Sequence, residues 1–397
     1  MDCLRWRNLC QIIILVLVLV CPYIGLSRVK ADTEAYISHI QHIHNISRYQ
    51  HDTFILDSWQ LPDFINMNAG MEDWHLTQPT QSKAVQYGDV ILAWYIGYYA
   101  TMYVIMSTGP AKVNWKVIKD LDAVEILDPS LPCQRNGFIS LDPRLYLHNR
   151  HLYIEHFRQV GKRHYVLYAD RLHYNASFDA LHVHPPVRQF VVEGELGSRP
   201  QKNWAAFEFQ PNRHTKSSIL YVYSINPHRI LHQHCVEHTV NLNMTTVSLT
   251  EYVPTPNLPV LWQYGELRGG SPAKVIHTLH GNRYLTFFHS QYLDSNTGML
   301  TYYMGAYLFQ AHPPFAMTHI TPDIIACKQC YNEEYGIAYK ALDYILFPMG
   351  FVIRERGQIL FVSVGRNDNS AYILKINKTA LVDYMVEVET KVLYTTK

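Results

Sequence analysis

The sequence predicts an all-β fold, namely a five-bladed β-propeller with a short N-terminal stem or helix. Strand-turn-strand units recur along the chain and begin near residues 89, 143, 205, 272 and 350, at intervals of 54, 62, 67 and 78 residues. Each hairpin is followed by a further β-rich run. Two hairpins in each of five repeats indicate four-stranded blades. A pair of β-sandwiches is the alternative, and it explains the even spacing less well.

The hairpins are predicted from turn chemistry between runs rich in β-branched and aromatic residues. The unit with the most distinct pattern has strands at Ala273–Leu279 and Arg283–His289 around the turn His280-Gly281-Asn282. Gly and Asn accept the positive φ that hairpin turns need. The other units are Pro143–Arg158 around Asn149-Arg150, Ala205–Ile225, Gly350–Gly365 and a weaker one at Gly88–Ser107.

The amino-acid composition limits which class of protein this can be and which partners it can bind. Of the 397 residues, 48% are hydrophobic, which is enough for a sizeable core, and the formal net charge is +1. No global field therefore attracts nucleic acid, and we expect no nucleic-acid partner. The chain contains 29 Tyr, a residue that favours strands and whose polar tip suits sheets facing sugars or water.

Residues 1–31 are predicted to be a signal peptide or a type II signal anchor. Arg5 and Arg7 precede an apolar run from Cys10 to Leu26, which is slightly short for a full membrane span. Val29-Lys30-Ala31 offers a cleavage site, whereas the preceding cations fit a single-pass anchor. Either interpretation sends the chain into the secretory pathway, to be held in the Golgi lumen or secreted.

The rest of the chain divides into a stem and a catalytic domain. Ile37, Ile40 and Ile43 have helical spacing, so residues 32–66 are predicted as a stem or N-terminal helix and residues 67–397 as the propeller. Four glycosylation sequons support a lumenal location; they begin at Asn45, Asn175, Asn243 and Asn377. Four cysteines follow the targeting segment and can pair in an oxidising compartment: Cys133, Cys235, Cys327 and Cys330.

Polar clusters recur at the starts of successive units and at the ends of their hairpins, points that converge on one axis in a propeller. Asp142 and Arg144 open one unit, and Lys202, Asn203 and Trp204 precede the next. A carboxylate can transfer protons, while Lys and Asn can bind sugar hydroxyls on which Trp stacks. Each cluster also has a simpler explanation, since Asp forms turns, Lys is often solvated and Trp often belongs to the core.

The later units add further candidates of the same kind. His228 and Arg229 follow one hairpin, Arg268 precedes the Gly269-Gly270 pair, and His289 ends the unit after it. Arg binds phosphate or carboxylate through two parallel hydrogen bonds, and Gly lets the backbone approach a ligand closely. Asp368 lies in the loop Gly365-Arg-Asn-Asp368, which by itself reads as a turn.

Two motifs resemble zinc sites, and neither has the required context. His234-Cys-Val-Glu237-His238 matches an inverted zinc-protease pattern that needs a helix, but its surroundings alternate like a strand. Cys327-Lys-Gln-Cys330 has no second C-x-x-C partner, so a local disulfide or free thiols are expected. We expect no metal site and no cofactor.

Several blocks together resemble the five-bladed propeller family of β-mannoside phosphorylases and β-1,2-mannosyltransferases, in its eukaryotic secretory branch. The resemblance extends from Gly88 to Leu381, and its blocks are DPRLYLHNRHLYI, QKNW, LYVYSINPHRI, RGGSPA, RYLTFFHS, YYMGAYLF, PPF, FPMGFV and VSVGRND. It implies that Asp142 is the general acid/base, that Lys202 and His289 bind phosphate or sugar, and that Asp368 binds the sugar in the −1 position. Leu141 departs from the family, which usually has an acidic residue there.

The resulting expectation is a glycosyltransferase of the secretory pathway that transfers mannose to a β-mannoside or glycan acceptor. Its partners are a carbohydrate substrate and either a nucleotide sugar or phosphate. One proton-transferring carboxylate, Asp142, suits transfer or phosphorolysis, since an inverting hydrolase needs a second carboxylate to activate water. The alternatives are a β-mannoside phosphorylase or hydrolase, and a non-catalytic carbohydrate-binding propeller.

Overall fold

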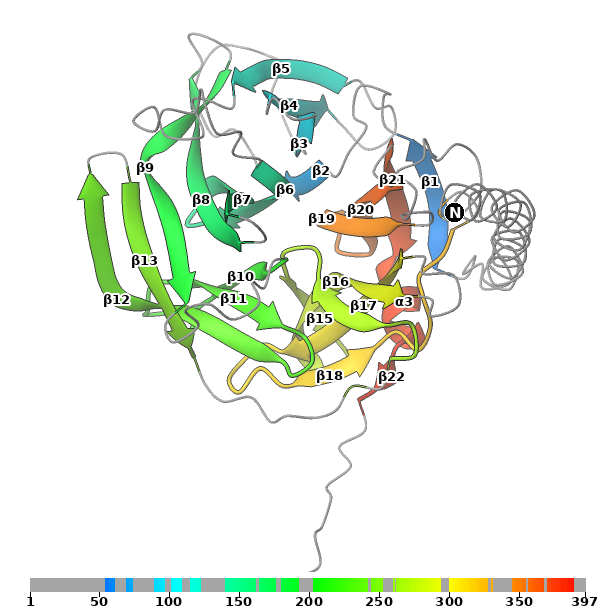
Figure 1. Cartoon of the computed structure of the whole chain (residues 1–397). Coiled ribbons are helices and arrows are strands. Elements are labelled where there is room, and N and C mark those ends of the chain that lie inside the picture. The colour runs from blue at the N-terminus through cyan, green and yellow to red at the C-terminus, as the bar shows by residue number, and fades with distance from the viewer. Residues whose placement is uncertain are drawn as a thin grey trace, which may run out of the picture.

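The protein is built almost wholly from antiparallel strands, as a computed structural model of the chain shows (Figure 1). The structure describes residues 54–60, 69–73, 89–96, 101–108, 115–122, 140–161, 164–175, 180–192, 203–241, 244–252, 260, 262–293, 300–327, 330, 345–354, 356–367 and 370–388. Within these residues the single helix is α3 (Lys378–Tyr384). The predicted all-β class is confirmed.

The strands fall into successive antiparallel groups in chain order. The first group is β2 (Ala69–Asp73), β3 (Asp89–Ile96), β4 (Thr101–Thr108) and β5 (Trp115–Asp122). The second is β6 (Ser140–His148), β7 (His151–Gly161), β8 (His164–Asn175) and β9 (Ala180–Val192). The third is β10 (Ala205–Phe209), β11 (Ser218–Ser224), β12 (Arg229–Asn241) and β13 (Met244–Glu251).

Two further groups complete the sequence. The fourth contains β14 (Glu266–Gly269), β15 (Lys274–Thr278), β16 (Gly281–Leu293), β17 (Leu300–Gln310) and β18 (Met317–Ile320). The fifth contains β19 (Leu346–Arg354), β20 (Ile359–Arg366) and β21 (Ser370–Asn377). The groups surround a common centre, with β2, β6, β10 and β19 nearest to it (Figure 1), and β6 contacts the other three of these strands.

The first and last strands of the described chain are hydrogen-bonded to these sheets. β1 (Ile55–Gln60) pairs antiparallel with β21, and the short β22 (Val386–Glu387) pairs with β18. β1 therefore supplies the outer strand of the last group, although it lies within residues 32–66, for which the sequence predicts a stem. Residues 1–31 lie outside the described part of the chain. No helix in the described part is both long enough and apolar enough to cross a bilayer.

The propeller prediction depends on how the groups join. β13 pairs in parallel with β9, from Met244 opposite Val187 to Leu249 opposite Val192, so the second and third groups share one eight-stranded sheet. Because of this shared sheet, the count of five blades stays a prediction. The buried apolar clusters nevertheless lie between neighbouring groups, as they do where propeller blades pack face to face.

The predicted hairpins form, and local turn chemistry explains them. Asn149 and Arg150 have φ values of 50° and 65°, which is the mirror-image turn whose twist matches the flanking strands. In the fourth group the turn lies one residue earlier than predicted, because Thr278 pairs with Gly281 and β16 already begins there. Gly281 has a φ of 92°, so the glycine is needed at the first position of the strand.

Candidate functional site

Arg144 is a fully buried cation close to the start of β6. The β6–β7 register shifts between Leu141 and Arg144, so Asp142-Pro143 lies in a bulge, where the missing N–H of proline is tolerated. Arg144 Nε donates a hydrogen bond to the carbonyl of Gly270, and Nη2 donates to Asn203 Oδ1 at 3.2 Å. One guanidinium thus joins the starts of the second, third and fourth groups.

The fifth group contacts the Arg144 guanidinium through Phe347. The guanidinium carbon of Arg144 lies 5.8 Å from the centroid of the Phe347 ring, and the His289 ring lies 4.3 Å from that centroid. Tyr302 also faces His289, with ring centroids 5.2 Å apart. Arg144, Asn203 and His289, which are distant in the sequence, are therefore brought together as one buried cluster, here termed the Arg144 cluster.

The Gly269-Gly270 pair makes this convergence sterically feasible. A Cβ added to Gly269 would lie 1.9 Å from the carbonyl oxygen of Asn203. A Cβ on Gly270 would lie 2.5 Å from the carbonyl oxygen of Phe287 and 2.8 Å from Pro348 Cγ. The close approach that the sequence suggested for a ligand is thus an approach of protein backbone, and it aligns Gly270 with Arg144.

Asn203 and Trp204 position the start of β10. Asn203 is buried and has a φ of 73°, a conformation that Asn adopts more readily than most residues. The Trp204 ring packs in the core between the second and third groups, with Phe157, Tyr221 and Tyr223 around it. The sequence suggested this ring for stacking on a sugar, whereas the structure places it among core aromatics.

Three predicted residues cannot be located by their side chains. Lys202 and Asp368 lie outside the described residues, and only the backbone of Asp142 is described, as part of β6. The residue before Asp368 is held firmly, because Asn367 Oδ1 accepts a hydrogen bond from the Ile345 N–H at 2.8 Å. The Asn367 N–H donates to the Ile345 carbonyl at 3.0 Å.

Arg268 lies beside the Arg144 cluster, in a different environment. It is opposite His289 in the β14–β16 register, so both side chains leave the same face of the sheet. Its Nη2 forms an ion pair with Glu266 Oε2 at 3.1 Å, and its side chain is 31% exposed. Solvent therefore reaches the Arg268 side chain, whereas Arg144 is fully buried.

His228 and Arg229 are placed away from that cluster. The His228 ring is buried beside Tyr307 and Phe309, 5.6 and 5.2 Å from their ring centroids, between the third and fourth groups. Burial lowers the pKa of His228 to about 4, so the ring is neutral at physiological pH. Arg229 lies 3.6 Å from Glu251 Oε1 and over the Tyr223 ring.

Glu155 is a buried carboxyl that the sequence patterns above do not single out. It is opposite Arg144 in the β6–β7 register, and neither of its oxygens has a hydrogen-bond partner among the described residues. Burial raises the pKa of Glu155 to about 8, and the Arg144 charge opposes that rise. The alternation of Tyr153, Glu155 and Phe157 on one face of β7 was the available signal, because both neighbours are core residues.

This environment predicts a pH-dependent stability. Below the ordinary pKa of 4.5 the carboxyl is neutral in both the folded and unfolded states; between 4.5 and about 8 only the unfolded state ionises. Stability should therefore fall as pH rises through this window. At pH 5 we expect Glu155→Gln to have the same free energy of unfolding as the wild type. At pH 9 the free energy of unfolding of the variant should be larger, by on the order of a few kcal/mol. Urea unfolding at pH 5 and at pH 9 measures this difference in the free energy of unfolding. A difference that is the same at both pH values would contradict the prediction.

The zinc-like motifs adopt the structures expected from their context. Residues 234–238 lie within β12, a strand, rather than on a helix. Cys327 and Cys330 form a disulfide. A separate buried pair, His156 and Asp170, lies on the other face of β7 with Nε2 and Oδ2 3.1 Å apart. Within the described residues no group of three His, Cys, Asp or Glu side chains is arranged to hold a metal ion.

Comparison with known proteins yields structural similarity only. No family model matches the chain, and no curated protein matches it. The fold is similar to MPT-1, a GDP-Man-dependent mannosyltransferase from Leishmania mexicana, at 12% identity and a TM-score of 0.48 over 85% of this chain and 94% of that one. MPT-4, a mannose phosphorylase from the same organism, gives 12% identity and a TM-score of 0.48 over 89% and 96%.

A third similar structure is bacterial. The β-1,2-mannobiose phosphorylase from Listeria innocua gives 13% identity and a TM-score of 0.41, over 80% of this chain and 91% of that one. At these values the similarities establish neither a family nor an activity. The function is therefore argued from the residues of this chain.

Proposed function

We propose that this protein is a glycosyltransferase of the secretory pathway that transfers mannose to a β-mannoside or glycan acceptor. Asp142 serves as general acid/base. The observation that carries the proposal is that Arg144 ties the starts of three strand groups together and contacts Phe347 of the fifth. These starts are the segments on which the sequence places the candidate residues.

Chain connectivity supports placing the remaining candidates near this cluster. Consecutive Cα atoms are about 3.8 Å apart, so the Cα of Asp142 lies within roughly 8 Å of that of Arg144. Lys202 directly precedes the buried Asn203, and Asp368 directly follows the anchored Asn367. The cluster itself is buried, so Arg144 acts as a positioning residue for the segments that carry Asp142 and Lys202.

The chemistry follows from one carboxylate among cations. Asp142 transfers a single proton, while Lys202 and Arg268 stabilise anionic oxygens of the donor. His289, which the sequence predicted for the same role, is buried beside Phe347 and is therefore a positioning residue like Arg144. Asp368 binds the transferred sugar. An activated donor such as a nucleotide sugar needs no second carboxylate to activate water. Transfer from GDP-mannose is therefore favoured over hydrolysis.

The proposed compartment is the lumen of the secretory pathway, with residues 1–31 as a cleaved signal or an uncleaved anchor. Four sequons follow that segment. The Cys327–Cys330 disulfide suits an oxidising environment, in which such bonds persist.

The proposal is tested with the full chain purified from a secretory host. With GDP-mannose and a β-mannoside acceptor, we expect extension of the acceptor, measured by mass spectrometry. Asp142→Asn should lower the rate by about 10²–10⁴-fold, because it removes the proton-transferring group without changing its size. Asp383→Asn, at an exposed carboxylate on α3, is the matched control and should leave the rate unchanged.

The same assay separates the alternatives. Formation of mannose 1-phosphate from a β-mannoside and phosphate indicates a phosphorylase, and release of free mannose in water indicates a hydrolase. Mannoside binding that survives Asp142→Asn, without turnover under any of these conditions, indicates a carbohydrate-binding propeller. Each of these results would replace the transferase assignment.

A further inference from the structure

A polar pocket lies at the opposite end of the inner strands from the Arg144 cluster. It has a volume of about 580 Å³ and is lined by the β6–β7 turn, the β10–β11 loop and residues of β15 and β16. Strands rise about 3.3 Å per residue, so Asn149 in this pocket lies roughly 20 Å along β6 from Asp142. The pocket, here termed the Glu208 pocket, is thus separate from the proposed catalytic end.

Glu208 is held in the pocket through one of its two oxygens. Oε1 accepts hydrogen bonds from the Ser217 hydroxyl at 2.5 Å and from the Asn149 N–H at 3.5 Å, and His148 Nδ1 lies 3.3 Å away. None of these contacts involves Oε2. The His148 contact, supported by Ser217 and Asn149, lowers the pKa of Glu208, so the group is a carboxylate at neutral pH.

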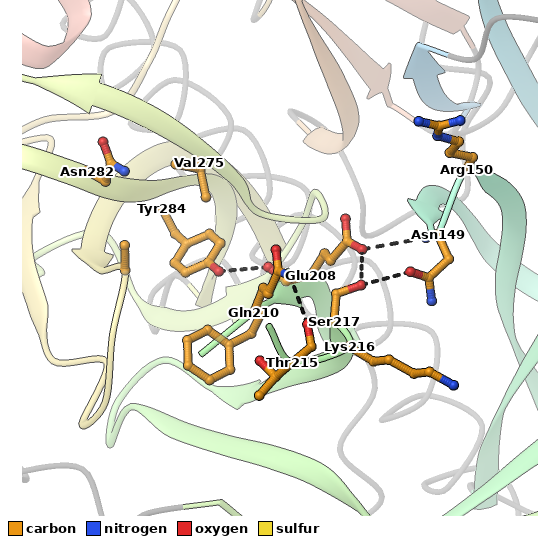
Figure 2. A pocket seen from close by; sticks show the side chains of 12 residues that line it. Asn149, Arg150, Glu208, Gln210, Thr215, Lys216, Ser217, Val275, Asn282 and Tyr284 are labelled. Carbon is orange, nitrogen blue, oxygen red and sulfur yellow. Dashed lines mark hydrogen bonds between the residues drawn. The ribbon is translucent and has the colours of Figure 1, made fainter. Parts of the chain in front are cut away.

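The surrounding groups fix the orientation of this carboxylate and add donors. Ser217 Oγ also lies 3.0 Å from Asn149 Oδ1, and the Tyr284 hydroxyl donates to the Glu208 carbonyl at 2.7 Å (Figure 2). Asn282 uses its carbonyl oxygen with His277 Nδ1 at 2.6 Å, which leaves its amide nitrogen as a donor. The pocket is therefore lined by a fixed acceptor, the Glu208 carboxylate, and by an amide donor, Asn282.

The charges select the class of ligand. The ends of Arg150 and Lys216 lie to either side of Asn149 (Figure 2), so both signs of charge line one pocket. A compact anion would be repelled by the Glu208 carboxylate, and a cationic peptide would be repelled by Arg150 and Lys216. A neutral ligand with many hydroxyl groups is repelled by neither the carboxylate nor the cations. Each of its hydroxyls can donate to a carboxylate and accept from an amide or a cation.

A second, smaller pocket extends this surface. It has a volume of about 230 Å³, shares Ser217 with the Glu208 pocket, and is lined by Arg188, His232, Gln233 and Tyr252 among others. Polar groups therefore continue from one pocket into the other. An extended ligand fits this arrangement better than a monosaccharide does.

From this arrangement we infer that the Glu208 pocket is a second, non-catalytic binding site for a neutral oligosaccharide. Glu208 Oε2 accepts hydrogen bonds from ligand hydroxyls, and Asn282, Lys216 and Arg150 donate to ligand oxygens. The inference is independent of the proposed transferase activity, because it concerns the other end of the strands.

The test measures binding of mannotriose and cellotriose by calorimetry to the full-length Asp142→Asn chain, in which turnover is removed. We expect Glu208→Ala in that background to weaken binding of at least one trisaccharide tenfold or more, and Glu387→Ala, at an exposed acid on β22, to leave it unchanged. The trisaccharide should also protect Lys216 from acetylation without protecting Lys378. An unchanged unfolding midpoint shows that Glu208→Ala folds.

Equal affinity of the Glu208→Ala and parent chains would overturn the inference, as would unprotected Lys216. Glu208-dependent binding of inorganic phosphate or hexalysine, with none of either trisaccharide, would also overturn it. Failure of mannose transfer in the earlier assay leaves these results unaffected. In the Asp142-containing chain, Glu208→Ala should preserve the rate of transfer to a short acceptor.

Discussion

Replacing Arg144 with methionine is expected to lower the free energy of unfolding by about 3–5 kcal/mol, because two buried hydrogen bonds from a charged donor, each contributing about 1.5–3 kcal/mol, are lost. The Gly270 carbonyl and Asn203 Oδ1 would lose their donor, and the starts of three strand groups would lose their common link. Mannose transfer should fall as well, because Asp142 and Lys202 lie on the released segments. Urea unfolding and the transfer assay measure the two effects.

The control for this substitution is Arg213→Met, at an exposed cation in the β10–β11 loop, which should change stability by less than about 0.5 kcal/mol. The double variant Arg144→Met, Glu155→Met tests whether the buried Glu155 carboxyl contributes to this loss. Replacing Glu155 as well removes a buried carboxyl that has no hydrogen-bond partner among the described residues, so the double variant should recover part of the stability. Transfer should stay low, because the links to Gly270 and Asn203 are still missing. A loss below about 1 kcal/mol for Arg144→Met would contradict its linking role.

Gly269→Ala is expected to destabilise the protein by about 3 kcal/mol, at the upper end of the range for overpacking. The added methyl would lie 1.9 Å from the Asn203 carbonyl oxygen, which is a backbone atom and cannot rotate away. The start of β10 and the end of β14 must therefore separate, and the Asn203–Arg144 hydrogen bond should lengthen or break. Thermal and urea unfolding measure the loss of stability, and the transfer rate reports the displacement of Lys202.

The matched control is Gly357→Asn. Gly357 has a φ of 86°, which Asn tolerates, and a Cβ there meets no atom within 4 Å. This substitution should cost less than about 1 kcal/mol, the usual scale for replacing an unhindered glycine. If both glycine variants were equally stable, the close approach of Gly269 to Asn203 would not be needed for folding.

Local patterns predicted the hairpins because their causes are local. Asn149-Arg150 accepts two positive φ values, and alternating β-formers flank it. The regular recurrence of such units predicted that their starts converge, and Arg144, Asn203 and His289 do come together. That inference needed only the fold class, since the inner strands of a propeller begin around one axis.

The roles of individual residues were harder to predict, because they depend on which side chains face each other across groups. Trp204 and His228 are polar-tipped aromatics that suit a sugar site by type, yet the structure places both in aromatic cores. Glu155 lies in a run of strand formers, and only its position opposite Arg144 distinguishes it. The Glu208 pocket is lined by the β6–β7 turn, the β10–β11 loop and residues of β15 and β16, whose separate sequences carry no common motif.

The sequence by itself determined the all-β class, the hairpins and the clustering of polar residues at the starts of the strand groups, since turn chemistry and alternation act over a few residues. The tertiary structure alone decided that Gly269-Gly270 faces Asn203, that Glu155 is buried beside Arg144 and that β1 closes the last group. Each of these contacts joins segments that are distant in the chain. Burial and close approach depend on such partners, and no local pattern encodes them.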